Sequence, residues 1–205
     1  MIHILFFDTS IIVCIKPRGV LSEGDAADSV PRLLAAQMRE KGESEAIFPV
    51  HRLDRETEGL MVYARTPAAA AALSRAIVEG KVKKEYLATL CGVPEAERGR
   101  LTDLLFYDRN RGKTYVVDRR RKGVKEAILE YRVLSVENGR ATVRVSLLTG
   151  RTHQIRAQFA SRGLPLVGDR RYGAPAEGQP LVLLSCHLSF PHPETGSLIC
   201  FDWEK

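Results

Sequence analysis

Several common signatures are missing from this sequence of 205 residues. No apolar run approaches the roughly 18 residues that suggest a membrane-spanning helix. Residues 1–10 contain no Lys or Arg, whereas a secretory signal starts with a basic segment. Neither G-x-x-x-x-G-K-S/T nor G-x-G-x-x-G occurs, so no glycine-rich phosphate loop indicates a nucleotide cofactor. We therefore expect a cytoplasmic protein with no membrane segment and no nucleotide cofactor.

Cysteine is scarce and shows no metal-site spacing such as C-x-x-C. The four cysteines are Cys14, Cys91, Cys186 and Cys200. A disulfide scaffold would carry them more densely, so we expect reduced and mostly buried thiols. His187 and His192 lie between two of them, but their spacing matches no common zinc pattern. The sequence therefore predicts no metal site.

The composition is that of an ordinary globular protein, with 44% hydrophobic and 27% charged residues. Apolar periodicity predicts strands interleaved with three helices. The expected strands are residues 2–7, 11–15, 60–64, 85–91, 127–136, 141–148 and 182–188. The expected helices are residues 30–39, with Ser29 as the cap, 66–80 and 153–162. Asn138-Gly139 predicts a tight hairpin. The pattern predicts one α+β domain, residues 1–205, on a largely antiparallel sheet.

The net charge of +6 is concentrated in one stretch of the chain. Residues 98–125 hold ten basic and three acidic residues, a charge of +7. The other 177 residues hold 21 basic and 22 acidic residues, a charge of −1. A local positive strip on a near-neutral protein indicates a polyanionic partner, most often nucleic acid. From charge alone, a solvated loop is an equally good interpretation.

Residues 51–60, HRLDRETEGL, place six ionisable side chains just before an apolar strand. Surface turns also have this composition. Asp54, however, lies between Arg52 and Arg55 and ahead of a Thr-x-Gly turn, where backbone can approach a ligand closely. A carboxylate between arginines favours its ionised form and can act as a nucleophile. We therefore consider Asp54 a candidate catalytic residue.

Residues 148–156, LTGRTHQIR, lead from a strand through a glycine into a helix. Arg156 falls one turn into that helix and borders the face of Ile155 and Phe159. The simpler interpretation is an ordinary helix start capped by Thr152. A half-buried arginine needs a partner, however, and Asp54 is a natural candidate.

Two further segments are less specific when taken alone. Residues 83–88, KKEYLA, place Tyr86 in a strand, where a tyrosine most often fills the core. Residues 163–173, GLPLVGDRRYG, form a loop rich in glycine and arginine.

Taken together and in this order, the segments resemble the RluA family of RNA pseudouridine synthases. The matching segments are IKPRGVL, HRLDRETEGL, KKEYLA, LLTGRTHQIRAQFASRGLPLVGDRRYG and LLSCHLSFPHPETG. They extend over nearly the whole chain, which makes chance similarity a poor explanation. The resemblance implies the pseudouridine synthase fold, an α+β fold with a mixed, largely antiparallel sheet and an active-site cleft across it. It also implies isomerisation of uridine within RNA, without metal or cofactor.

The resemblance also implies roles for individual residues. Asp54 matches the essential aspartate, for which attack on C1′, attack on C6 and removal of the 2′ proton remain alternatives. Arg156 matches the arginine that pairs with this aspartate. Tyr86 matches the tyrosine that packs on the target base and assists proton removal at C5. Arg52 matches an arginine that holds the flipped-out nucleotide, and Leu183 falls where the family places an apolar residue under the base.

The remaining substrate-binding candidates lie in the GRTHQIR segment and in the basic strip. They are Arg151, His153, Gln154, Arg119, Arg120 and Arg121. We expect residues 98–125 to form an arm that grips RNA, with a hairpin tip at residues 110–113. The expected partner is ribosomal or transfer RNA, and we expect a monomer.

The sequence departs from the family pattern at three positions. Glu58 stands where Ser is usual, Ile15 where Asn is common, and Leu184 where His is frequent. Glu58 places an extra negative charge near Asp54, which bears on substrate choice. Many relatives carry an S4-like RNA-binding module before the catalytic domain. Here the catalytic pattern begins within the first ten residues, so we expect a stand-alone catalytic domain without that module.

Two other functions are compatible with part of the pattern. Asp54 with Glu56 or Glu58 could form the paired carboxylates of a nucleosidase or glycosidase, which would release free base. The adjoining arginines and the basic strip fit that chemistry poorly. An RNA chaperone of the same fold would not need the candidate catalytic residues Asp54, Tyr86 and Arg156, all of which are present.

Overall fold

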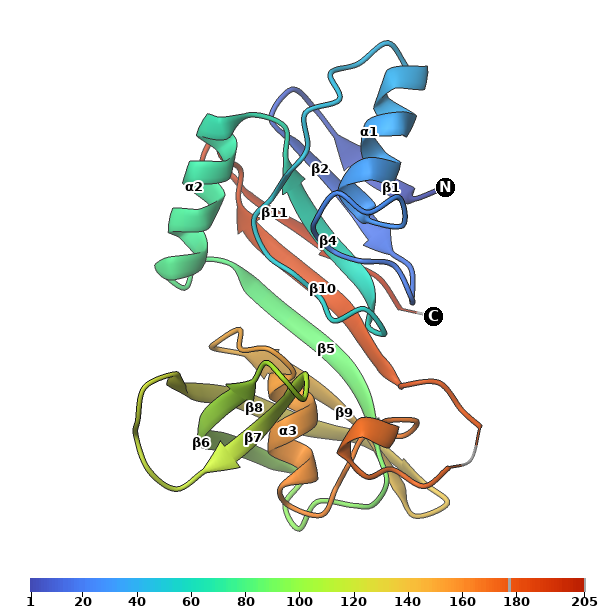
Figure 1. Ribbon diagram of the computed structural model, residues 1–205, viewed down its shortest axis with the longest axis vertical. Helices are drawn as coiled ribbons and strands as arrows, with labels where there is room; N and C mark the ends of the chain where they lie inside the picture. Colours follow the sequence, from blue (N-terminus) through green and yellow to red (C-terminus); the bar gives the residue numbers. More distant parts are fainter. Residues whose placement is uncertain (177, 205) are drawn as a thin grey trace. The chain divides into compact units, whose positions relative to one another are not determined.

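The computed structural model describes residues 1–176 and 178–204 and divides the chain into two compact units. The first unit comprises Met1–Lys84 together with the chain from Ser185 onward. The second unit is Glu85–Leu184. The single domain 1–205 stays a prediction. Three helices and a largely antiparallel arrangement of strands confirm the α+β class (Figure 1).

In the first unit, neighbouring strands follow the order β1-β2-β4-β10, with β3 beside β4 and β11 beside β10. The pairs β1–β2, β2–β4, β3–β4 and β10–β11 are antiparallel. The strands are β1 (His3–Phe7), β2 (Ile11–Lys16), β3 (Phe48–Pro49), β4 (Glu58–Ala64), β10 (Leu183–Pro191) and β11 (Leu198–Asp202). Leu183 and Leu184, at the start of β10, belong to the second unit. β3 and β11 were not predicted.

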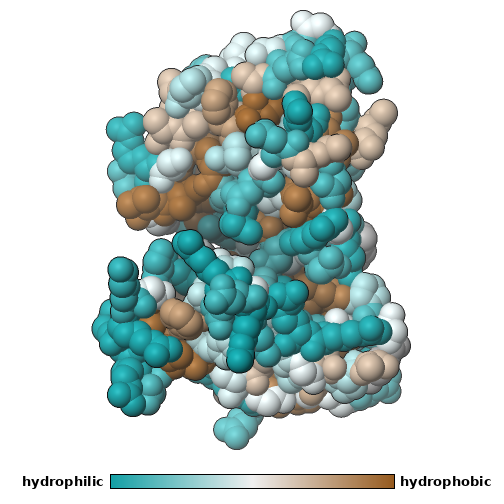
Figure 2. Space-filling view, in the orientation of Figure 1, coloured by the Kyte–Doolittle hydropathy of each residue, from teal (hydrophilic) through white to brown (hydrophobic). Residues whose placement is uncertain are grey.

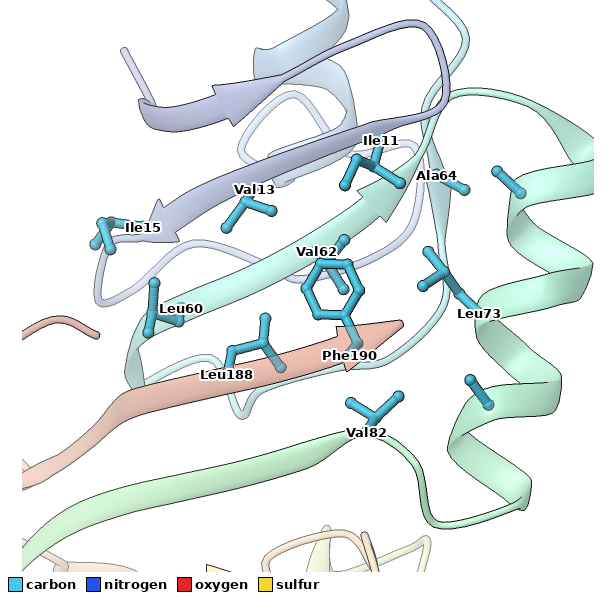
Figure 3. Close-up of a cluster of buried hydrophobic side chains, with 12 residues drawn as sticks. Ile11, Val13, Ile15, Leu60, Val62, Ala64, Leu73, Val82, Leu188 and Phe190 are labelled. Carbon is cyan, nitrogen blue, oxygen red and sulfur yellow. The ribbon is translucent and has the colours of Figure 1, made fainter. Parts of the chain in front are cut away.

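The core of the first unit packs one face of these strands against helix α2 (Pro67–Val78). Figure 3 shows alternate residues of β2 and β4 pointing toward Leu188 and Phe190 of β10 and Leu73 of α2. The intervening residues of β2 and β4 are buried as well. β2 and β4 are therefore the apolar runs expected of strands covered on both faces.

The two helices of the first unit begin differently. Thr66 caps α2, since its Oγ1 accepts a hydrogen bond from the Ala69 N–H at 3.0 Å. Helix α1 (Val30–Glu40) begins after Ser29, as expected. The Ser29 hydroxyl, however, donates a hydrogen bond to the Gly24 carbonyl at 2.8 Å and not to the helix. The expected side-chain cap by Ser29 is therefore wrong. Its hydroxyl stabilises the loop before the helix instead.

The second unit has the strand order β5-β9-β8-β6-β7, and each adjacent pair is antiparallel. The strands are β5 (Lys83–Leu90), β6 (Arg98–Asp108), β7 (Lys113–Val117), β8 (Val124–Glu137) and β9 (Arg140–Leu147). Lys83 and Lys84, at the start of β5, belong to the first unit. The basic stretch is therefore mostly strand, with a hairpin tip between β6 and β7 near the expected position. Asn138 and Gly139 both have positive φ, at 51° and 72°, which confirms the tight β8–β9 hairpin.

Helix α3 (Gln154–Ala160) and the 3₁₀ helix η1 (Arg170–Tyr172) complete the second unit. Leu105, Ala127, Ala157 and Tyr172 form a buried apolar cluster that joins β6, β8, α3 and η1. Phe159, buried as expected, packs edge-on against Tyr131 at 5.5 Å between ring centroids. Among the residues described, no helix is long and apolar enough to cross a membrane.

Asp8 organises the turn between β1 and β2. Its Oδ1 accepts hydrogen bonds from the N–H groups of Ser10 at 2.8 Å and Ile11 at 2.9 Å. Its Oδ2 lies 2.7 Å from Nε2 of His192. Burial raises the pKa of the Asp8 carboxyl, but the hydrogen bonds from Ser10, Ile11 and His192 outweigh burial and lower its pKa below the ordinary value.

We expect Asp8→Asn to lower the free energy of unfolding at neutral pH by about 1–2 kcal/mol, since it weakens charge-assisted hydrogen bonds. A carboxyl with a lowered pKa stabilises the fold above its unfolded pKa, and this contribution is lost as the pH falls through the folded pKa. The difference between wild type and variant should therefore shrink below about pH 4. Urea unfolding at several pH values measures it. Asp25→Asn, at an exposed position, is the control, and an equal effect there would contradict the assignment.

Candidate active site

Asp54 lies in the loop between β3 and β4, and backbone contacts shape this loop. The Thr57 N–H donates to the Asp54 carbonyl at 3.0 Å, which closes a tight turn. Gly59 follows with a φ of +127°. A Cβ on Gly59 would lie 2.3 Å from the Ser185 carbonyl oxygen, so only glycine lets β4 pass this closely beside β10. The glycine of the Thr-x-Gly turn thus permits a close approach of backbone to backbone, as expected, but the partner is the neighbouring strand β10.

Backbone groups of the residues before and after Asp54 are fixed to the segment after β2. The Ser22 hydroxyl donates to the Leu53 carbonyl at 2.8 Å and accepts from the Leu53 N–H at 3.0 Å. On the other side, the Arg55 carbonyl accepts from the Gly19 N–H at 2.8 Å. Ser22 and Leu53 are both buried. Asp54 is therefore held by its two neighbours in the chain.

Lys16 adds a buried positive charge to this loop. Its ammonium donates to the carbonyls of Pro17 at 2.8 Å, Val20 at 2.9 Å and Arg55 at 3.0 Å. Burial lowers the pKa of Lys16 to about 8, and nearby carboxylates, Asp54 among them, oppose that shift. The side chain therefore stays charged at neutral pH. It connects the Lys-Pro-x-Gly segment to the Asp54 loop.

His51, three residues before Asp54, is a structural acceptor. Its Nε2 accepts a hydrogen bond from the Val62 N–H at 3.1 Å. Burial, together with the positive charge of Lys84, lowers the pKa of His51 to about 3. The ring is therefore neutral at physiological pH, and it anchors the loop to β4.

Arg52, the expected nucleotide-holding residue, lies on the same loop with its side chain exposed. Its guanidinium forms an ion pair with Glu23. An exposed ion pair contributes little free energy, so Arg52 can exchange Glu23 for another anion at small cost. Asp54, Arg52 and Lys16 thus belong to one local arrangement in the first unit.

Arg156 lies in α3 of the second unit and is buried. Its Nε and Nη2 donate to Oδ2 and Oδ1 of Asp169 at 2.6 and 2.9 Å, and its Cζ lies 5.0 Å from the Tyr172 ring centroid. This bidentate contact and the aromatic face fix the plane of the guanidinium. The pairing of Arg156 with Asp54, which lies in the other unit, stays a prediction.

The residues just before and within the start of α3 are held by a compact hydrogen-bond network. The buried Gln154 amide oxygen accepts from the Arg151 N–H at 3.0 Å, and its amide nitrogen donates to the Ile128 carbonyl at 3.1 Å. His153 has a positive φ of 53°, and its Nδ1 lies 3.0 Å from the Tyr172 hydroxyl. Gln154 therefore orders this turn, and substrate contacts by these residues stay predictions.

The other predicted site residues lie elsewhere in the second unit. Tyr86 is buried in β5 opposite Val145 of β9, and Leu183 is buried at the start of β10. Arg119, Arg120 and Arg121 occupy the exposed connection between β7 and β8.

Sequence reasoning missed two residues that position the candidate arginine and aspartate, Asp169 and Ser22. Asp169 stands in GDRRYG after Gly168, whose added Cβ would lie 2.1 Å from the Pro180 carbonyl oxygen. A buried arginine demands an acidic partner, and Asp169 is the acid nearest to Arg156 in the following sequence. The sequence predicts an acidic partner for Arg156, but the residue expected in that role is Asp54. Nothing in the sequence marks Ser22, because its partners are backbone groups of a distant loop.

Comparison with known proteins identifies the family. The family model described as RNA pseudouridylate synthase matches residues 10–161. The Dual-specificity RNA pseudouridine synthase RluA of Yersinia pestis is 34% identical, with 98% of each chain covered. An uncharacterized RNA pseudouridine synthase of Aquifex aeolicus is 35% identical over all of this chain and 69% of that protein. The chain belongs to the RluA family of RNA pseudouridine synthases, isomerases that convert uridine in RNA to pseudouridine.

Two further comparisons concern length and fold. Ribosomal large subunit pseudouridine synthase D of Neisseria meningitidis is 32% identical over 98% of this chain, which spans 57% of that relative. The solved structure of Human RNA Pseudouridylate Synthase Domain Containing 4 has a TM-score of 0.81 and 25% identity. It covers 98% of this chain and 88% of its own. The fold is thus that of the pseudouridylate synthases.

We expect Ser22→Ala to lower kcat for pseudouridine formation on the order of ten-fold, because Leu53, the residue before Asp54, loses both of its backbone hydrogen bonds to the hydroxyl and the carboxylate shifts. KM for RNA should change little. Ser22→Thr, which keeps the hydroxyl, should restore much of the rate, and Ser74→Ala on the exposed face of α2 is the matched control. Wild-type kcat in a folded Ser22→Ala protein would rule out this positioning role.

Proposed function

We propose that this enzyme isomerises a specific uridine of ribosomal or transfer RNA and that Asp54 is its catalytic aspartate. The observation that carries the proposal is the fixed loop around Asp54. Its neighbours Leu53 and Arg55 are tied to Ser22, Gly19 and the buried ammonium of Lys16. A catalytic carboxylate requires such preorganisation. The relatives, a dual-specificity RNA pseudouridine synthase and a ribosomal large subunit pseudouridine synthase, support the choice of RNA.

The reaction needs no oxidant and no leaving molecule. The N1–C1′ bond of the uridine breaks, a C5–C1′ bond forms, the proton on C5 leaves and N1 ends with a proton. Every atom of the nucleotide is conserved apart from this proton exchange. In our proposal Asp54 promotes the first step, by one of the three routes open for the family. We propose that the chain's own residues fill these roles without a metal or a cofactor.

The second unit supplies the other proposed catalytic residues. Tyr86 packs on the target base and assists removal of the C5 proton, and Leu183 lies under the base. Arg156 is the arginine partner of Asp54. Its bidentate contact with Asp169 supports this role, because an arginine held in one plane presents its remaining N–H groups in a fixed direction. Around it, Arg151, His153 and Gln154 contribute to nucleotide binding.

The basic strip, residues 98–125, is the proposed RNA-gripping arm. A uridine within structured RNA must be extruded before it can react, at a cost of a few kcal/mol. Arg52 holds the extruded nucleotide, and phosphate contacts from Arg119, Arg120 and Arg121 offset the cost. All three arm arginines are exposed, and the ion pairs of Arg119 with Asp118 and of Arg120 with Glu126 lie at the surface. We also propose that the enzyme works as a monomer in the cytoplasm.

The catalytic assignment is tested by Asp54→Asn. We expect tritium release from RNA labelled at C5 of uridine to fall about 10³-fold or more, because the amide cannot act as a nucleophile or base. Asp25→Asn, an exposed acid in the same unit, should retain the wild-type rate. Chemical mapping of pseudouridine in total RNA from cells with and without the gene identifies the uridine. No change at any uridine would overturn the proposed function, and free base among the products would indicate a hydrolase.

The arm is tested by reversing the charge of Arg119, Arg120 and Arg121 to Glu. We expect weaker RNA binding and a slope of log Kd against log salt that is smaller by roughly two to three, because about 0.7–0.9 is lost per phosphate contact. Filter binding over a salt series measures both. The control reverses Arg32, Arg39 and Arg75, exposed arginines of α1 and α2. Equal affinity and slope in the arm variant and wild type would show that the arm does not bind RNA.

A further inference from the structure

A second basic element lies outside the proposed arm but packs against it. η1 begins with Arg170 and Arg171, and both side chains are exposed. The guanidinium of Arg171 donates to the carbonyl of Gly112, at the tip of the β6–β7 hairpin. A Cβ on Gly112 would lie 2.9 Å from Nη1 of Arg171, so the tip and η1 are in close contact. The sequence separates these two segments by nearly sixty residues, whereas the fold makes them neighbours.

Buried hydrogen bonds hold this contact rigid. The Thr114 N–H donates to the Tyr172 hydroxyl at 2.8 Å, and the Thr114 hydroxyl donates to the Thr152 carbonyl at 2.7 Å. Thr114 and Tyr172 are both buried. The ammonium of Lys113 lies 5.1 Å from the Tyr172 ring centroid. These bonds therefore join three segments into one surface: β7, the turn that precedes α3, and η1. The backbone positions from which its side chains extend are fixed.

We name this surface the tip face, and its charge is strongly positive. Its five basic side chains are Arg109, Arg111, Lys113, Arg170 and Arg171. Two acids lie among them, and both are already engaged. Asp108 accepts from the N–H groups of Asn110 at 3.0 Å and Arg111 at 3.1 Å, and Asp169 is paired with the buried Arg156. In Figure 2, strongly hydrophilic residues gather over the second unit, where Figure 1 draws β6 and β7.

We propose that the tip face binds backbone phosphates of the substrate RNA and that Arg170 and Arg171 each contact one. The proposal rests on the proposed function and adds a second anchoring element to the arm. Exposed guanidiniums on a rigid base suit phosphate oxygens, because the donors are already oriented and lose little entropy on binding. Acidic protein partners share the charge but not the regular spacing of an RNA backbone.

The position of Tyr172 connects this face to the candidate catalytic arginine. The centroid of its ring lies 5.0 Å from Cζ of Arg156. Its hydroxyl accepts a hydrogen bond from the N–H of Thr114, which follows the hairpin tip in β7. A phosphate on Arg170 or Arg171 is therefore bound within two residues of Tyr172, whose ring contacts Arg156. This places the RNA backbone in a fixed register with respect to Arg156.

The test is Arg170→Gln/Arg171→Gln, measured by filter binding to a transcript that carries the uridine found by mapping. We expect the slope of log Kd against log salt to fall by roughly 1.5 and Kd to rise on the order of ten-fold near 0.2 M salt, the loss of about two phosphate contacts. Arg170→Lys/Arg171→Lys keeps the charge and should restore most of the slope. The control, Arg32→Gln/Arg75→Gln, changes the net charge by the same amount in the first unit.

The outcomes separate this proposal from the proposed function. If wild type isomerises the transcript but the double variant binds it with wild-type Kd and slope, the tip face is wrong and the function stands. If the control lowers the slope equally, only net charge matters, and the tip face is again wrong. If wild type isomerises no RNA, the proposed function itself has failed. Circular dichroism and thermal unfolding check that the variants are folded. If Gln at position 171 disturbs the contact with Gly112, the salt slope of the double lysine variant still tests the proposal.

Discussion

The buried ammonium of Lys16 is the interaction on which the candidate catalytic loop depends. Moving a charge out of water costs on the order of several kcal/mol unless hydrogen bonds replace the solvent. Three carbonyls do so here, two from the segment after β2 and one from Arg55. The ammonium is satisfied only when these segments meet. The hydrogen bonds that replace water around the Lys16 ammonium therefore also fix Arg55, the residue that follows Asp54.

The second unit solves a similar problem with an arginine. Arg156 is buried, and its charge is matched by the bidentate contact with Asp169. Breaking such a pair by removing one partner typically costs about 3–5 kcal/mol, because the other charge is left buried. η1, which follows directly after Asp169 and ends at Tyr172, is thereby tied to α3. In each unit, a cation that must be satisfied orders the chain around a candidate catalytic group.

These two cations also explain which parts of the molecule were predictable from sequence. Most of the long strands, all three helices and the hairpin at Asn138-Gly139 are predicted because periodicity and turn residues are local signals. β6, with eleven residues, was not predicted as a strand, because its part of the chain was interpreted from its charge. β3, with only two residues, and η1, with three, are too short to show a period. Lys16 and Ser22 each bond to backbone groups of the distant Asp54 loop, Arg55 for Lys16 and Leu53 for Ser22, which no side-chain pattern reveals. Asp169 was visible as a residue, but its partner depends on how α3 and η1 pack.

The basic strip shows the same limit for charge. Composition shows that ten basic residues lie in residues 98–125, but it does not predict the secondary structure that carries them. In the structure, most of this stretch is paired strand, and its hairpin tip is fastened to η1 through Thr114, Gly112 and Tyr172. A flexible arm would lose conformational entropy whenever it bound RNA, and that loss would reduce affinity. A hairpin already held by buried hydrogen bonds avoids most of it. The rigidity of the tip, as much as its charge, is what makes it suitable for holding a phosphate backbone in register.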